Sequence, residues 1–217
     1  MISRLDRDVR RLGSPTTAQL RTVRRRLSRE LAQPAATDVI ALAERLVRRD
    51  GPFDRFIAYE LIAAHPTALA ALSGPILRRL GQGMDSWGDV DTFACYVAGP
   101  AWREGSITDA EIMRWAQASD RWWRRAGVVS TVALNVRARG GTGDPRRTVM
   151  ICELAVDDRD PMVVKALSWA LRELVVWDPE AVRRFLDTHH EVLAARVTRE
   201  VRSKLETGRK HPARRAT

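Results

Sequence analysis

The chain has 217 residues, with 37 Lys and Arg against 27 Asp and Glu, so its formal net charge is +10 at pH 7. This length allows one large domain or two small ones with a substantial core. A chain this basic attracts polyanions at long range, and nucleic acid is the first candidate. Nearly all of the basic residues are arginines, because only Lys165, Lys204 and Lys210 are lysines. Arginine binds phosphate through a planar, bidentate fork that lysine lacks.

The same composition argues against several other classes of protein. The two cysteines, Cys95 and Cys152, have no CxxC spacing, and they form no metal-ligand pattern with the four histidines. We therefore expect no disulfide, no metal and no cofactor. Charged residues occupy the first positions, where a signal peptide would need an apolar core, and the longest apolar stretches are too short to span a bilayer. We expect a soluble, cytoplasmic protein that acts as a monomer and has no membrane partner.

Apolar residues recur at helical spacing along nearly the whole chain, without convincing period-two alternation, which predicts an all-α fold. The expected helices run over residues 3–12, 16–33, 36–49, 53–65, 67–81, 89–98, 108–118, 120–138, 146–157, 160–176, 178–188 and 190–206. The stretch from Gly140 to Pro145 is typical of a loop, and it lacks the Gly-Lys-Ser/Thr of a phosphate-binding loop. We expect one domain over residues 1–206 and a basic, disordered tail over residues 207–217.

An internal repeat connects these helices. A shift of 40 residues superimposes five pairs of similar residues, which are Thr108 and Thr148, Asp120 and Asp160, Arg125 and Lys165, Ala126 and Ala166, and Leu134 and Leu174. HEAT and armadillo repeats have lengths near this period, and each of their helical hairpins buries its apolar face by stacking on neighbours. The sequence therefore predicts a HEAT-like or armadillo-like solenoid. Its concave face would be basic, with Arg125 and Lys165 on it.

The stretch Trp87-Gly88-Asp89-Val90-Asp91 places an indole and a carboxylate four residues apart, on one face of a helix. These two groups together suit a cationic substrate, or a transition state that becomes positive. The alternative is structural, with a core indole beside a carboxylate at the start of a helix.

Three segments carry a resemblance to a known family. The segment Trp87 to Phe93 resembles a Trp-Asp-x-x-Asp helix, Arg121 to Ala126 a Trp-x-x-Arg-Ala helix, and Lys165 to Glu173 a Lys-Ala-x-x-Trp-x-Leu-Arg-Glu helix. These are patterns of the AlkD-like DNA alkylation repair glycosylases, which are HEAT-like solenoids that remove cationic alkylpurines. The resemblance begins at a similar turn, Leu12-Gly13-Ser14-Pro15-Thr16, and extends to Leu205.

The resemblance implies a role for each matching residue. Asp91 would be the catalytic carboxylate, Trp87 and Trp169 would be the aromatic walls, and Arg125 would contact the DNA backbone beside the lesion. Further DNA contacts are expected from Arg121, Arg124, Lys165 and Arg172. The alternative for these arginines is a solvated role or, for Arg172, an ion pair with a neighbouring repeat. In two respects the sequence departs from the family: Gly88 stands where an acidic residue is common, and few residues precede Gly13.

The chemistry follows from the charge of the lesion. Alkylation at N3 or N7 makes a purine cationic, so the base leaves without the protonation that an ordinary glycoside needs. One ionised Asp can then stabilise an oxocarbenium-like transition state and orient the attacking water. The sequence therefore predicts a glycosylase for 3-methyladenine or 7-methylguanine in duplex DNA. The alternatives are a non-catalytic helical-repeat module that binds nucleic acid, and a protein-interaction scaffold.

The remaining tryptophans and histidines are expected to be structural. Adjacent residues on a helix point in different directions, so one of Trp122 and Trp123 should lie in the core and the other on the concave surface. Packing roles are expected for Trp102, Trp115 and Trp177. The pair His189-His190 falls at a helix junction, where a capping or solvated role is expected.

Overall fold

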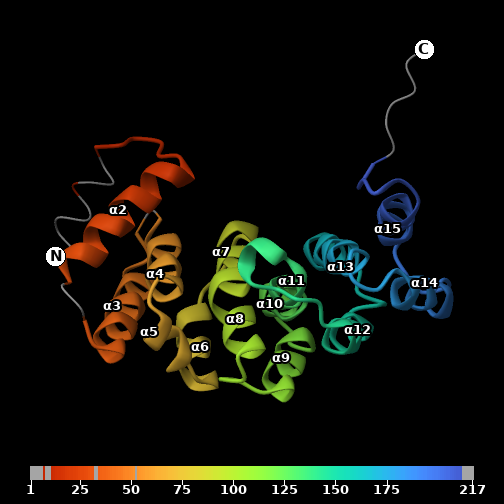
Figure 1. Ribbon diagram of the computed structural model, residues 1–217, viewed down its shortest axis with the longest axis horizontal. Coiled ribbons are helices and arrows are strands. Elements are labelled where there is room, and N and C mark those ends of the chain that lie inside the picture. Colours follow the sequence, from red (N-terminus) through yellow and green to blue (C-terminus); the bar gives the residue numbers. More distant parts are fainter. Residues whose placement is uncertain (1–6, 8–10, 32–33, 52, 212–217) are drawn as a thin grey trace, which may run out of the picture. The chain divides into compact units, whose positions relative to one another are not determined.

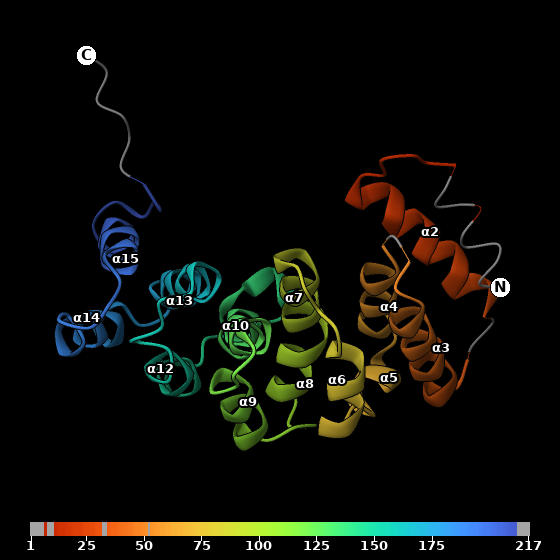
Figure 2. The same cartoon turned by 180° about the vertical axis from the view of Figure 1, so that it is seen from behind.

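The computed structural model describes residues 7, 11–31, 34–51 and 53–211 of the chain. Every regular element in this part of the chain is a helix, which confirms the predicted all-α, helical-repeat class (Figures 1 and 2). The backbone contacts divide the chain into two compact units, Met1–Gly83 and Met84–Thr217. The expected single domain over residues 1–206 and its basic concave face stay predictions, and the two units are described separately below.

The first unit is a set of helices packed around α4. Its elements are α2 (Thr17–Glu30), α3 (Ala36–Arg49), α4 (Asp54–Ala63), α5 (Pro66–Ala70) and α6 (Gly74–Gly81). Helix α4 packs against α2, α3 and α5, and the fully buried Tyr59 on it donates a hydrogen bond of 2.9 Å to the Leu80 carbonyl. The helix expected over residues 67–81 is two helices, because Pro75 at the start of α6 cannot donate a backbone hydrogen bond to a preceding turn. The helix expected over residues 3–12 lies mostly outside the described residues.

The second unit contains the segments with family-like motifs. Its elements are α7 (Trp87–Phe93), a π-helix η1 (Ala94–Ala98), α8 (Gly99–Arg103), α9 (Asp109–Ala116), α10 (Arg121–Ser130), α11 (Val132–Asn135), a 3-10 turn η2 (Arg137–Arg139), α12 (Pro145–Glu153), α13 (Pro161–Leu174), α14 (Pro179–Thr188) and α15 (Ala195–Thr207). Helix α10 packs against α7, α9 and α13, and α13 packs against α15. The element α10 is therefore the centre of this unit.

The 40-residue repeat is visible at the starts of α10 and α13. Asp120 accepts a hydrogen bond of 2.6 Å from the Trp122 amide, and Asp160 accepts one of 2.7 Å from the Met162 amide. Each aspartate therefore caps its own helix at the same position. The equivalent Ala126 and Ala166 are both fully buried. The repeat fails at its charged position, because the structure buries Arg125 and exposes Lys165.

In the second unit, three more expected helices differ clearly from the observed ones. The helix expected over 89–98 begins at Trp87, passes into the π-helix η1 and continues into α8. The helix expected over 120–138 ends at Ser130 and is followed by two short turns, and the helix expected over 190–206 begins only at Ala195. The start of the expected disordered tail also contacts α15, since Lys210 lies 3.6 Å from Glu200. Residues 212–217 lie outside the described residues.

Candidate active site

Asp91 lies on α7, a helix whose first turn is fixed by a serine cap. The Ser86 hydroxyl accepts a hydrogen bond of 3.2 Å from the Asp89 amide and donates one of 2.8 Å to the Asp89 carboxylate. The motif Ser-x-x-Asp is a known start signal for a helix, and this signal explains why α7 begins two residues earlier than expected. The Asp89 carboxylate is therefore part of the cap of α7. It does not take the place of the acidic residue that is common in the family at the position of Gly88.

Arg125 on α10 holds both oxygens of Asp91. Its Nε donates to Oδ1 at 2.9 Å and its Nη2 donates to Oδ2 at 2.8 Å, while Nη1 donates to the Met162 carbonyl. The Arg125 side chain is 6% exposed and the Asp91 side chain 18%. A bidentate pair of this kind fixes the carboxylate in both distance and plane.

The expected contact of Arg125 with the DNA backbone stays a prediction. In the structure the residue is buried, and three of its nitrogens donate to protein oxygens. A phosphate would therefore have to compete with the Asp91 carboxylate for the same guanidinium.

An aromatic cluster supports α7 from behind the site. The rings of Phe93, Trp115 and Trp123 lie 5.1 to 6.0 Å apart between centroids, and Phe93 is fully buried. Aromatic pairs at this spacing add packing energy beyond their buried area. The cluster packs α7, which carries Asp91, against α9 and against α10, which carries Arg125. Packing roles are confirmed for Trp115 and for the fully buried Trp102.

The two expected aromatic walls differ in their environments. Trp87 is 61% exposed at the first position of α7, which leaves its indole free to meet a ligand and excludes the alternative of a core residue. Trp169 on α13 is half-buried, and its indole N–H donates to the Glu173 carboxylate at 2.9 Å. The charges of Asp91 and Glu173 both act to raise the pKa of the Cys95 thiol.

Burial and nearby charge act in opposite directions on Asp91. Burial raises the pKa of its carboxyl above the ordinary value, although the hydrogen bonds and charge of Arg125 and the charge of Arg139 oppose this. Burial also raises the pKa of the neighbouring Cys95 thiol to about 12. The thiol is therefore neutral at physiological pH.

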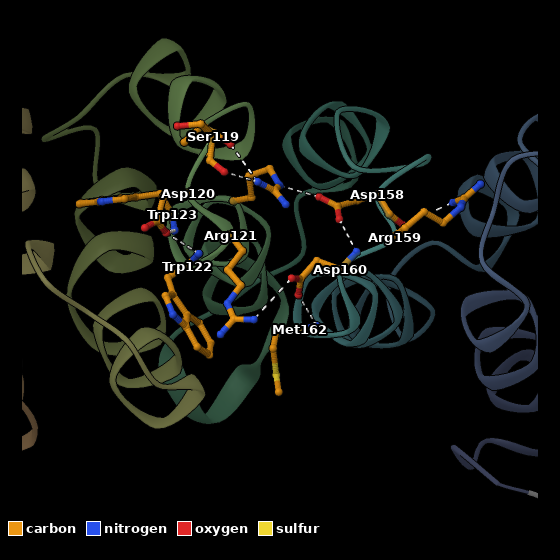
Figure 3. Close-up of polar contacts among 11 residues, drawn as sticks. Ser119, Asp120, Arg121, Trp122, Trp123, Asp158, Arg159, Asp160 and Met162 are labelled. Atoms are coloured by element: carbon orange, nitrogen blue, oxygen red, sulfur yellow. Dashed lines mark hydrogen bonds and ion pairs between the residues drawn. The ribbon is translucent and has the colours of Figure 1, made fainter.

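The arginines at the start of α10 are tied to the loop before α13 (Figure 3). Arg124 donates to the Asp158 carboxylate at 2.6 Å and to the carbonyls of Ala118 and Ser119. Arg121 lies over the Trp122 ring, 4.7 Å from its centroid, and 3.8 Å from Asp160, with a side chain that is 53% exposed. Arg121 is therefore accessible to a ligand, whereas the Arg124 guanidinium is engaged by protein oxygens. The expected DNA contacts of both arginines stay predictions.

The two other expected DNA contacts lie on α13. Lys165 is exposed. Arg172 is half-buried and donates to the Ser168 hydroxyl at 3.3 Å, and that hydroxyl donates to Glu200 at 2.7 Å. Burial is the largest effect on Arg172 and lowers the pKa of its guanidinium. Arg172 is therefore linked to Glu200 through the Ser168 hydroxyl, and its expected contact with DNA stays a prediction, as does that of Lys165.

Two residues at the site were not anticipated from the sequence. Arg139, in η2, lies over the Tyr96 ring at 4.3 Å from its centroid, and its charge acts on Asp91. Tyr96 lies in η1, directly after the helix that carries Asp91. The sequence gives one signal for them, which is the position of Arg139 directly before the glycine cluster, where a loop was expected.

The described part of the chain contains no group of His, Cys, Asp and Glu residues that could hold a metal ion. Within the same residues, each helix is too short or too polar for a bilayer span.

The fold and the site together define an all-helical repeat protein in which a buried guanidinium holds a partly exposed carboxylate, on a helix that also carries an exposed indole. The chain matches the family described as DNA alkylation repair enzyme over residues 7–205. No curated protein and no solved structure matches it. The chain belongs to the DNA alkylation repair enzyme family, and the expected family is confirmed. Its role is accordingly in DNA alkylation repair.

Proposed function

We propose that this protein is a DNA glycosylase that releases cationic alkylpurines, such as 3-methyladenine and 7-methylguanine, from duplex DNA. The observation that carries the proposal is the fixed carboxylate of Asp91, four residues from the exposed indole of Trp87 on the same helix. A cationic base can stack against the indole. The carboxylate then lies on the same helix face, where the sugar becomes positive as the bond breaks.

Asp91 keeps capacity for a water molecule although Arg125 holds both of its oxygens. A carboxylate has about four acceptor positions, and Arg125 occupies one on each oxygen. The side chain is also 18% exposed. We infer that Asp91 accepts a hydrogen bond from the attacking water and stabilises the oxocarbenium-like sugar, while Arg125 prevents the carboxylate from rotating.

The alkylated base supplies its own leaving-group activation, so the reaction needs no general acid. This agrees with the side chains around Asp91, because the Cys95 thiol, with its pKa raised to about 12, is too weak an acid to protonate a leaving group. The same argument limits the substrate, since an uncharged purine would leave slowly. Specificity for a cationic base therefore follows from one carboxylate and one exposed indole.

The test is release of free base from duplex DNA that contains 7-methylguanine, in a single turnover with enzyme in excess. We expect the wild type to release the base, and Asp91→Asn to be slower by about 100-fold to 1,000-fold, the usual cost of losing a charge-stabilising group. Asp89→Asn is the matched control on the same helix. It keeps the cap of α7 and should release base at the wild-type rate.

The same assay separates the other functions. If the wild type binds the duplex and releases no base, the protein is a non-catalytic nucleic-acid-binding module. The pairing of Asp91 with Arg125 would then explain the lack of activity. Weak binding that does not change with salt would indicate a protein scaffold. Thermal unfolding of both variants shows whether a loss of release reflects a loss of fold.

A further inference from the structure

Glu173 on α13 is a carboxylate that is bonded to the edge of an aromatic ring. The indole N–H of Trp169, one helical turn earlier, donates to its Oε1 at 2.9 Å. Both side chains are half-buried. Within the described part of the chain, Glu173 forms no ion pair at direct contact distance, whereas both oxygens of Asp91 are held by Arg125. The direct partner of Glu173 is therefore an indole and not a cation.

Trp169 and Glu173 lie on the less buried face of α13, and the first turn of this helix contacts Arg125. Arg125 donates through Nη1 to the Met162 carbonyl and through its two other donors to Asp91. Met162 lies two helical turns before Trp169, so both side chains project from the same face of α13. The pair of Trp169 and Glu173 therefore continues the helix face that begins at Met162.

The Cys95 thiol lies within the electrostatic reach of both carboxylates. Burial is the largest effect on its pKa and raises it, and the charges of Asp91 and Glu173 raise it further. The charges of Arg139 and Arg125 oppose this rise. Since an electrostatic effect weakens with distance, the two carboxylates and the two guanidinium groups lie around one buried sulfur atom. Glu173 therefore belongs to the same group of charges as Asp91.

Arg172, the cation next to Glu173 in the chain, does not neutralise this carboxylate alone. It donates to the Ser168 hydroxyl at 3.3 Å. Burial is the largest effect on the pKa of Arg172 and lowers it, while the charges of Glu200 and Glu173 both act to raise it. The positive charge of Arg172 is therefore shared between two carboxylates, and part of the negative charge of Glu173 remains available to the indole.

A carboxylate at this position changes the ring that it touches. The N–H bond lies in the plane of the indole, so the carboxylate meets the edge of the ring and leaves its faces open. A charged acceptor polarises the N–H bond and moves electron density toward the ring. The face of the indole then becomes more negative and attracts a cation more strongly. The negative charge of Glu173 thus reaches a ligand through Trp169.

We propose that Glu173 is a positioning residue that acts through Trp169 and makes this indole selective for the positive charge of the damaged nucleotide. The proposal rests on the proposed function and on the expected contact of Trp169 with the lesion. It adds the group that gives this aromatic wall its preference for a cation. A neutral base of the same shape should gain nothing from Glu173.

The test compares binding of a cationic lesion with binding of its neutral isostere. The probes are two duplexes of one sequence, one with 7-methylguanine and the other with 7-methyl-7-deazaguanine, which has the same shape and no positive charge. Both damaged nucleotides carry a 2′-fluoro sugar, because the fluorine stabilises the glycosidic bond. We expect the wild type to bind the cationic duplex more tightly, and Glu173→Gln to lower this preference by about 3-fold to 10-fold.

Glu173→Gln separates charge from structure. The glutamine oxygen still accepts the indole N–H, so a purely structural role of Glu173 would be retained in this variant. Binding of the neutral duplex should not change. Trp169→Phe removes the N–H that links the ring to Glu173, so adding Glu173→Gln to Trp169→Phe should cause no further loss of preference.

Glu206→Gln is the matched control, because it removes the same charge from an exposed position of α15 in the same unit. It should keep the full preference for the cationic duplex, and thermal unfolding reports any damage to the fold. The proposal is overturned if the wild type binds both duplexes equally, or if Glu173→Gln keeps the wild-type preference. Equal losses in Glu173→Gln and Glu206→Gln, or additive losses with Trp169→Phe, would also overturn it.

Failure of the proposed function would look different. A wild type that releases no base would refute the glycosylase, yet the two duplexes would still report whether Glu173 acts through Trp169. Release by the wild type, together with an unchanged preference in Glu173→Gln, would refute only the role of Glu173.

Discussion

At the scale of single residues, the pair of Asp91 and Arg125 combines two demands that oppose each other. The reaction needs an ionised carboxylate, but burial raises the pKa of Asp91. Arg125 offsets this burial with two hydrogen bonds and a positive charge. The same charge reduces the attraction between Asp91 and a cationic transition state. The guanidinium thus favours the ionised form of the carboxylate and holds it in position, at some cost in electrostatic stabilisation.

Arg125→Gln should therefore shift the pH dependence of base release. Catalysis requires ionised Asp91, so the rate falls as the pH drops through the pKa of this residue in the folded protein. Loss of Arg125 removes effects that lower this pKa, and the acid limb should move to higher pH by about one pH unit or more. Single-turnover release from pH 4 to 8 measures the shift.

Arg124→Gln is the control for that shift. It removes the same charge one residue away, where the guanidinium pairs with Asp158 instead of Asp91. If the acid limb moves equally in both variants, the shift comes from the loss of one positive charge anywhere on the protein. That result would contradict a direct effect of Arg125 on the pKa of Asp91.

Gly88 provides a second test at the residue scale. A β-carbon at Gly88 would meet nothing closer than 3.8 Å, so Gly88→Ala should stabilise the protein by up to about 1 kcal/mol through helix propensity. Gly127→Ala is its opposite, because a β-carbon there would lie 2.7 Å from the Ala116 backbone nitrogen. We expect that change to destabilise the protein by about 1–3 kcal/mol. Urea unfolding shows whether each variant has a higher or a lower free energy of unfolding than the wild type.

At the scale of elements, most helix starts were predicted, and several of them have a cap that is written into the sequence. The helices expected from residues 16, 36, 53, 67, 108, 120, 146, 160 and 178 begin within one residue of the observed starts. Four of these starts follow an aspartate that accepts backbone amides, which are Asp120, Asp144, Asp160 and Asp178. Local hydrogen bonding decided these boundaries, so local sequence was sufficient to find them.

The parts of the site that were not predicted depend on contacts between distant segments. The π-turn η1 follows from Pro100 together with Gly99, where a β-carbon would lie 2.6 Å from the Ser130 carbonyl oxygen. Arg139 reaches the site because Arg103, 36 residues earlier, holds its carbonyl. The 40-residue repeat likewise suggested equal roles for Arg125 and Lys165, but only Arg125 faces a carboxylate on a neighbouring helix. The 40-residue period of the sequence does not predict which residues of distant segments contact each other.

The N-caps of the repeat lead to a prediction of their own. Asp120→Ala and Asp160→Ala should each cost about 1 kcal/mol of stability, because each leaves helix amides without an acceptor. Asp187→Ala is the control, since Asp187 is exposed near the C-terminal end of α14, where a carboxylate opposes the helix dipole. Thermal or urea unfolding compares the three variants. A loss at Asp187 as large as at the caps would mean that general charge effects dominate.

At the scale of the whole molecule, the candidate chemistry and much of the basic charge fall in different units. Asp91, Arg125 and Arg139 all belong to the second unit, Met84–Thr217. In the first unit, α2 carries the arginines Arg21, Arg24, Arg25, Arg26 and Arg29. Arg26 and Arg29 also line a cavity of about 490 Å³ together with Arg11. Glu60 pairs with Arg21 and lies near Arg24, whereas Arg25 and Arg29 are exposed.

This division predicts that binding and catalysis can be separated. Replacing Arg25 and Arg29 together by Ala should weaken duplex binding and reduce the slope of log K against log salt by about 0.9 for each phosphate that the variant no longer neutralises. Release at saturating enzyme should keep its wild-type rate, because Asp91 and its partners are unchanged. The matched control replaces Arg45 and Arg48, two exposed arginines of α3, by Ala. It removes the same net charge, so an equal reduction of the slope would mean that α2 contributes only to the overall field. A fall in the saturated rate would instead show that α2 takes part in the chemical step.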